Sequence, residues 1–251
     1  MNSSFARICY ILRLRSGGLL GSTKRYLEAD VATIEQRYGD KTVPCIPSTY
    51  MKGLVRRTLE ALEDLLIRAN IIAESITHDL FGAMLGIDKI NISPTVIPSK
   101  ITFGSALPVA DISVAKKFSQ SEPLSYMCSN EILSEDISYY VEPHVRICDP
   151  TSSVSEGGLF HEYKLAPKQL FYGEILIHEK NEERLKEFCR AILISLMFLN
   201  YLYVGRSTTT ADVVILSVAP PSLLQDAIIS QILKISKEII KGWASSSKRS
   251  S

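Results

Sequence analysis

The chain has 251 residues, enough for one large domain or two small ones, and 46% of them are hydrophobic and 22% charged, which is typical of a globular protein. A formal net charge of +1 argues against a uniformly basic coat for nucleic acid, although a local basic groove is compatible with it. Five scattered cysteines without a CxxC pair disfavour a disulfide framework and a structural zinc site, and no apolar run is long enough to cross a bilayer. We therefore expect a cytoplasmic protein without a membrane partner.

The N-terminal segment alternates between apolar and polar residues over residues 5–15. This period of two predicts a half-buried strand, with Arg7, Arg13 and Arg15 on a basic outer side. A glycine-containing turn over residues 16–22 ends the strand, and a long polar excursion follows up to Pro47.

The most informative stretch is the sequence Ile-Pro-Ser-Thr-Tyr-Met-Lys-Gly at residues 46–53, which opens a predicted helix over residues 49–69. Pro47 favours an extended approach, and Ser48 or Thr49 is expected to cap the free amides of the first turn. Three cations follow at once, and acids are normally preferred at this end of a helix. Their placement fits a bound anion such as a phosphate; an ordinary capped helix with solvated cations is the alternative. These cations are Lys52 and Arg56, four residues apart on one face, and Arg57 to their side.

The remaining pattern alternates strands and helices in an α+β order. Strands are predicted at residues 100–103, 107–112, 169–178 and 213–218, hairpin arms at 141–147 and 159–165, and helices at 182–199 and 223–240. This order matches a ferredoxin-like or RRM-like core with large lid and hairpin-arm insertions. We expect a single domain over residues 1–244, with insertions at about 16–47 and 113–165, and a disordered tail at 245–251.

Residues 46–57 resemble the Ile-Pro-Gly-Ser-Ser-Leu-Lys-Gly…Arg signature of the RAMP superfamily, the RNA-binding subunits of CRISPR effector complexes. The stretch looks most like the repeated backbone subunit of type III complexes, although Ser48 replaces the glycine usual at the third position. Residues 78–82 resemble the Leu-Phe-Gly segment that follows this helix in the family, and they also read as a helix end closed by glycine. The resemblance implies a ribonucleoprotein with guide RNA, target RNA and other RAMP subunits, including copies of itself, as partners.

The resemblance also implies where RNA binds. The helix start would grip the guide backbone, and a glycine-containing loop at residues 204–210 would lie against it. The implied contacts are Ser48, Thr49, Lys52, Arg56, Arg57, Arg13, Arg15, Gly205, Arg206 and Ser207, with Lys24 and Arg25 read more simply as solvated. The hairpin arm would act as a thumb that separates base pairs of the guide–target duplex, with Val145, Ile147, Leu159 and Phe160 as its apolar wedge; a mobile surface hairpin is the alternative.

Asp30 is the candidate catalytic residue, because catalytic backbone subunits carry an aspartate in the loop upstream of the helix start. A carboxylate there could orient the ribose 2′-hydroxyl for attack on its own phosphate, with a divalent metal ion, Mg or Mn, stabilising the developing charge. Glu28, Glu35 and Asp40 compete for this alignment, and a solvated acid is the simpler reading. The alternative function is a non-catalytic scaffold that only binds guide RNA and assembles the complex.

The histidines and the aromatic residues offer weaker support for an RNA-processing or base-stacking role. The histidines, His78, His144, His161 and His178, could suggest acid–base ribonuclease chemistry, but His178 is expected to be packed on a strand. Tyr201 and Tyr203 are interpreted as core residues rather than stacking platforms. Walker, GxSxG and HExxH motifs are missing from the sequence, which disfavours a stand-alone small-molecule enzyme.

Overall fold

The computed structural model describes residues 5–18, 31–32, 34–38, 41–85, 95–129, 137–148, 153–204 and 209–247. Its centre is a five-stranded antiparallel sheet in the order β12-β1-β11-β7, with β8 also paired to β11. These strands are β1 (Phe5–Leu14), β7 (Ile101–Phe103), β8 (Leu107–Pro108), β11 (Leu170–His178) and β12 (Ala211–Ala219).

Two helices connect the main strands, α1 (Ser48–Arg68) between β1 and β7 and α4 (Glu182–Phe198) between β11 and β12. The chain order β1-α1-β7-β11-α4-β12, together with the spatial order of the strands, is the split βαβ arrangement of ferredoxin-like folds. The predicted α+β class and ferredoxin-like core are therefore confirmed.

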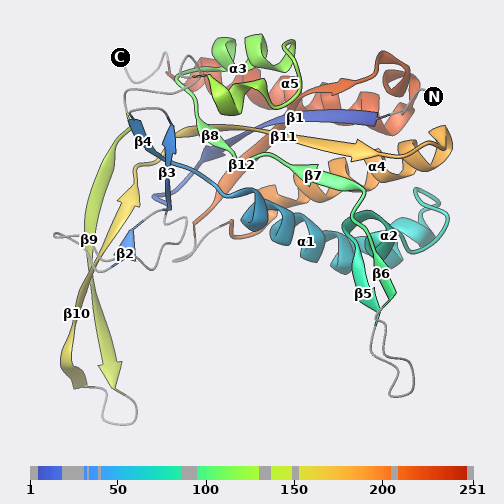
Figure 1. The fold of residues 1–251 in the computed structure, drawn as a ribbon. Coiled ribbons are helices and arrows are strands. Elements are labelled where there is room, and N and C mark those ends of the chain that lie inside the picture. Colours follow the sequence, from blue (N-terminus) through green and yellow to red (C-terminus); the bar gives the residue numbers. More distant parts are fainter. Residues whose placement is uncertain are drawn as a thin grey trace.

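The sheet buries both of its faces (Figure 1). Ile8, Tyr10 and Leu12 of β1 pack in a large core with α1 and α4, while Cys9 and Ile11 pack in a second core with α3 (Ile112–Ser119). Helix α5 (Ala227–Ser247) contributes to both cores, the first through its N-terminal half and the second through its C-terminal half. The described helices include none that is long and apolar enough to span a membrane.

The basic outer side predicted for β1 is wrong at Arg7, which is only 6% exposed. Its Nη2 lies 2.5 Å from Oε1 of Glu174, which is fully buried, and Nη2 also donates to the Phe118 carbonyl. Burial alone lowers the pKa of Arg7, but the hydrogen bond to Glu174 reverses this and raises it overall. The residues around α3 cover this face of the sheet, so an exposed basic surface here is excluded.

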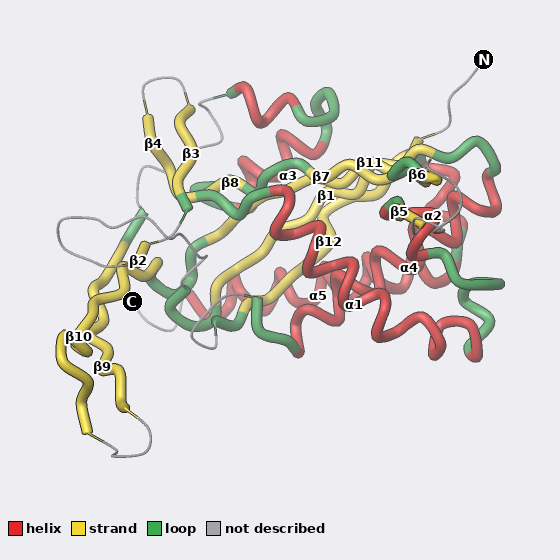
Figure 2. The backbone as a smooth tube through the Cα atoms, turned by 60° about the horizontal axis from the view of Figure 1, so that its bottom comes forward, coloured by secondary structure: helices red, strands yellow, loops and turns green. Residues whose placement is uncertain are grey.

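Three hairpins extend beyond the central sheet (Figures 1 and 2). The long arm pairs β9 (Tyr139–Cys148) with β10 (Ser153–Leu165), and β2 (Val31–Ala32) lies parallel to β10 at its base. The shorter hairpins are β3 (Glu35–Tyr38) with β4 (Lys41–Pro44), and β5 (Ala83–Leu85) with β6 (Thr95–Ile97). The predicted hairpin arm is thus present and longer than expected, while the side chains of its predicted wedge lie outside the described residues.

Some boundaries differ from the sequence-based expectations. The strand predicted to run to residue 112 ends at Pro108, and α3 and a 3₁₀ helix at Ser125–Cys128 occupy a region expected to be a strand end and irregular chain. Helix α5 begins at Ala227, after a 3₁₀ turn at Pro221–Gln225, and continues to Ser247, inside the expected tail.

Helix α2 (Thr77–Phe81) is closed by glycine, as predicted. Gly82 has φ +80°, and a Cβ there would lie 2.7 Å from the Ile97 carbonyl oxygen. Only glycine fits here without strain, because any other residue would be strained at this positive φ and its Cβ would clash with the backbone of β6.

Candidate nucleic-acid interface

The start of α1 is fixed by backbone contacts with the segment before β8. Ile46 and Ala106 exchange two backbone hydrogen bonds of 2.9 Å, and the Ser48 amide donates to Ser105 Oγ at 3.3 Å. The predicted side-chain cap is wrong, because the cap position belongs to Pro47, whose side chain accepts no hydrogen bond, and the Tyr50 and Met51 amides donate to the Pro47 carbonyl instead. No acidic residue lies in that turn either, so it is left with exposed positive potential, which anions favour.

Lys52 and Arg56 lie on the side of α1 that faces β6 and α2. Lys52 Nζ donates to Ser99 Oγ at 2.9 Å, and Arg56 Nε lies 2.9 Å from Glu60 Oε1. Partial burial and the neighbouring Arg56 charge both lower the pKa of Lys52. Arg56 also lines an open pocket of about 440 Å³ with His78 and Ser99.

Arg57 projects on the other side of α1. It is exposed, its Nε donates to the Gly53 carbonyl at 3.3 Å, and the structure gives it no acidic partner among the described residues. It lines a pocket of about 330 Å³ between α1 and the chain after α4, together with Phe198 and Tyr203. The three predicted cations of α1 are therefore close in sequence but divided between two sides of the helix.

Gly53 separates these two sides. A Cβ built at this position meets nothing within 4 Å, so the residue is not needed for internal packing. Glycine inside a helix costs about 0.5–1 kcal/mol relative to alanine. Gly53 therefore leaves the helix without a side chain between Arg56 and Arg57, where the Gly53 carbonyl accepts from Arg57 Nε.

The two predicted arginines of β1 do not join Lys52 and Arg56. The Arg13 guanidinium lies 5.2 Å from the Trp243 ring centroid, on the α5 side of the sheet. Arg15 Nε lies 3.3 Å from Asp212 Oδ1, and Arg15 also donates to the Asn200 carbonyl, which places it beside the chain after α4.

The predicted loop at residues 204–210 has a well-defined base, although Gly205, Arg206 and Ser207 lie outside the described residues. The Val204 amide donates to the Thr209 carbonyl at 2.8 Å. Thr210 in turn donates its amide to Ser16 Oγ at 2.9 Å and accepts from the Arg15 amide at 2.9 Å. The end of β1 therefore anchors this loop. Asp30, Lys24 and Arg25 also lie outside the described residues.

The same turn after β1 anchors the arm. Gly18 and Leu165 exchange backbone hydrogen bonds of 2.9 and 2.8 Å. A Cβ on Gly17 would lie 1.7 Å from Tyr140 Oη, so a larger residue at this position would displace the exposed tyrosine side chain that packs here. The arm and the predicted RNA loop therefore share one rigid junction at residues 15–18.

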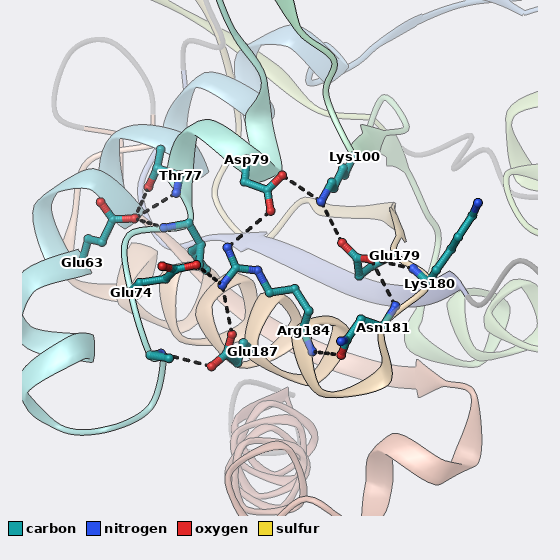
Figure 3. A network of polar contacts seen from close by, with 12 residues as sticks. Glu63, Glu74, Thr77, Asp79, Lys100, Glu179, Lys180, Asn181, Arg184 and Glu187 are labelled. Atoms are coloured by element: carbon teal, nitrogen blue, oxygen red, sulfur yellow. Dashed lines mark hydrogen bonds and ion pairs between the residues drawn. The ribbon is translucent and has the colours of Figure 1, made fainter.

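A network of charges holds the helices around α1 in place (Figure 3). Lys100 Nζ lies 2.7 Å from Asp79 Oδ1 and 2.8 Å from Glu179 Oε2, which ties α2 to the start of α4. Arg184 reaches Asp79 and Glu187 from α4. We assign this network a structural role, because both of its paired cations, Lys100 and Arg184, are each bound by two or more carboxylates.

Sequence reasoning missed or misplaced several side chains. Tyr201 and Tyr203, interpreted as core residues, are 82% and 64% exposed. His178, expected to be packed, is exposed and lies against the Phe5 ring. A signal was present for the tyrosines, since Asn200 and Gly205 bracket them and neither suits a buried helix.

The described residues contain no cluster of side chains that could bind a metal ion. Groups of three or more His, Cys, Asp or Glu residues that could hold an ion do not occur there. The described cysteines whose side chains are placed, Cys9, Cys45, Cys128 and Cys189, are free thiols.

The fold defines a ferredoxin-like α+β protein whose helix α1 carries Lys52, Arg56 and Arg57 in its first turns. The sequence model of the RAMP superfamily matches residues 31–210, and the chain belongs to that superfamily. No curated protein matches the sequence.

Two chains of solved type III-B Cmr-beta complexes share the fold at low sequence identity. A chain of the type III-B Cmr-beta complex in the apo state has a TM-score of 0.52 and 14% identity, over 84% of this chain and 97% of that one. A chain of type III-B Cmr-beta bound to cognate target RNA has a TM-score of 0.50 and 15% identity, over 86% of this chain and 60% of that one. Csc2 of Thermofilum pendens aligns with a TM-score of 0.46 and 15% identity, over 95% of this chain and 74% of that one.

Proposed function

We propose that this protein is a guide-RNA-binding backbone subunit of a type III CRISPR ribonucleoprotein. Membership of the RAMP superfamily and a fold shared with chains of Cmr-beta complexes support this proposal. One of those complexes is described as bound to target RNA. Other RAMP subunits, copies of this chain, guide RNA and target RNA are the partners that the proposal requires.

The observation that carries the proposal is the start of α1. It combines a first turn without an acidic residue, a glycine at position 53 that leaves the helix without a side chain there, and cations on both sides of that glycine. Such a surface grips a sugar-phosphate backbone without reading bases. Sequence-independent binding is what a guide-carrying subunit needs, because base pairing reads the target.

Salt titration of RNA binding tests this proposal. The purified protein, alone and in the reconstituted complex, is titrated with guide RNA between about 50 and 200 mM salt. We expect affinity to fall steeply with salt and each Lys52→Ala or Arg57→Ala change to reduce the slope by about one. Unchanged slopes in both variants would place RNA elsewhere and refute the proposal.

We further propose that Asp30 supports cleavage of the paired target RNA. Val31, the next residue in the chain, pairs with Glu162 at the base of the arm, so β2 brings the chain close to the element proposed to open the duplex. The 2′-oxygen would attack the adjacent phosphorus, its proton would leave to a base, and the 5′-oxygen would depart and take up a proton. The products would be a cyclic phosphate and a 5′-hydroxyl.

A divalent ion, Mg or Mn, would stabilise the phosphate charge in this reaction, and Asp30 would be its ligand from this chain. The second candidate is the non-catalytic scaffold, which has the same fold and basic helix start but only binds guide RNA and assembles the complex. Asp30→Ala in the assembled complex separates the two. Lost cleavage with retained target binding supports catalysis, whereas unchanged cleavage assigns the subunit to the scaffold.

A further inference from the structure

Two tyrosines that follow α4, Tyr201 and Tyr203, are unusually exposed for large aromatic side chains. We call them the tyrosine strip. Tyr201 is 82% and Tyr203 64% exposed, and Phe198 beside them is 40% exposed. Phe198 and Tyr201 have ring centroids 5.9 Å apart. Exposed aromatics that cluster in this way mark binding surfaces more often than isolated ones do.

Each ring of the tyrosine strip has an arginine beside it. Tyr203 shares the pocket of Arg57, and Tyr201 lines a second pocket of about 460 Å³ with Arg15. Phe198 lines both pockets and so joins them into one surface. Aromatic faces next to cations are the combination that binds single-stranded nucleic acid, with bases on the rings and phosphates on the cations.

The backbone under the strip is held firmly. Tyr203 forms a β-bridge with Thr210, Leu199 and Val204 are fully or almost fully buried, and Asn200 bonds to the Val213 backbone. The backbone that carries the two tyrosines is therefore already ordered, so it should lose little conformational entropy when a ligand binds. Two residues of extended chain span at most about 7 Å, a distance that neighbouring unstacked nucleotides can bridge.

We propose that Tyr201 and Tyr203 are stacking platforms for unpaired bases of an RNA strand whose phosphates lie at Arg57. This inference rests on the proposed function and deepens it, because it adds base-face contacts to a backbone grip. The uncompensated Arg57 charge at the edge of the strip favours a polyanion over an apolar protein partner as its occupant.

The test compares single-stranded oligouridylate with the same RNA carrying abasic sites, bound to the full-length protein. Tyr203→Ala and Tyr201→Ala are each expected to weaken binding of the oligouridylate roughly 5- to 150-fold at an unchanged salt slope. Tyr203→Phe and Tyr201→Phe, which keep the ring, should bind as the wild type does. Abasic RNA should bind the wild type and the alanine variants equally. Cross-linking of thiouridine RNA should map to residues 201–203.

The outcomes separate this inference from the proposed function. If Lys52→Ala and Arg57→Ala weaken RNA binding while both tyrosine-to-alanine changes leave it unaltered, the stacking role is overturned and the RNA-binding function stands. If the alanine changes at the tyrosines instead impair only assembly with other subunits, the strip is a protein interface and the inference fails. If RNA binding responds to none of these changes, the proposed function fails as well.

Discussion

The Lys52 ammonium lies 2.9 Å from Ser99 Oγ, so the first cation of α1 is tied to the turn between β6 and β7. This hydrogen bond orients Lys52 but leaves its charge without an acidic partner among the described residues. Since Ser99 also donates to and accepts from the backbone around Leu80 and Ile101, the contact forms one fixed edge of the proposed RNA surface.

Lys52→Ala and Ser99→Ala should therefore differ in their effects on RNA binding. Lys52→Ala removes a phosphate contact, and we expect weaker binding with a salt slope smaller by about one. Ser99→Ala removes the hydrogen bonds of Ser99 to Lys52 and to the backbone around Leu80 and Ile101, but it keeps the charge of Lys52, so its slope should match that of the wild type. Filter binding at several salt concentrations measures both; equal slopes in all three proteins would remove Lys52 from the interface.

Gly53→Ala should separate stability from binding. A Cβ there meets no neighbour, so the change should stabilise the protein by about 0.5–1 kcal/mol through better helix propensity. The same methyl group would hold a phosphate chain away from the bare backbone, and we expect weaker guide binding. Thermal melts and RNA titrations on one preparation measure the two effects. An increase in stability without any loss of RNA affinity would show that RNA does not approach Gly53.

The sequence predicted the central fold because its strands and long helices carry strong periodicity. The alternation of Ile8, Tyr10 and Leu12 identified one face of β1 correctly. It could not show that the opposite face is also covered, since Arg7 reads as an exposed cation unless its distant partner Glu174 is known. A buried ion pair that joins residues far apart in sequence leaves no periodic signal.

The candidate site was only partly predictable for a similar reason. The cations of α1 are visible in the sequence, but their division between two sides depends on which segments pack against the helix. Tyr201 and Tyr203 follow a strongly apolar helix, and local composition suggested that burial continued. In the structure the chain after α4 forms a β-bridge between Tyr203 and Thr210 at the surface, and both tyrosine side chains are mostly exposed.

The buried pair of Arg7 and Glu174 gives a stability prediction. Glu174 accepts from Arg7, from Tyr172 Oη at 2.7 Å and from the Leu124 amide at 2.8 Å. Arg7→Met leaves this carboxylate buried without its cation and should destabilise the protein by about 3–5 kcal/mol. Lys241→Ala breaks an exposed pair with Glu238 and is the matched control, with an expected change of less than about 1 kcal/mol. Chemical denaturation measures both, and similar losses would contradict the assigned burial.

Glu63, which links α1 to α2, should contribute to the acid sensitivity of the fold. Burial raises the pKa of Glu63, but hydrogen bonds from the Ile76 and Thr77 amides, Thr77 Oγ1 and Ser75 Oγ outweigh this and lower it overall. A carboxyl whose pKa is lower in the folded state stabilises the fold above its unfolded pKa, and this stability is lost as pH falls. The loss should begin near the ordinary value of 4.5 and continue below it.

Glu63→Gln should therefore lower the free energy of unfolding at neutral pH and reduce its decline between about pH 5 and pH 3. Glu60→Gln, on the exposed side of the same helix, is the control and should keep the wild-type decline because it removes only a surface ion pair with Arg56. Urea denaturation across this range compares the three proteins. If the free energy of unfolding of Glu63→Gln falls with pH as steeply as that of the wild type, the Glu63 carboxylate does not contribute to the acid sensitivity.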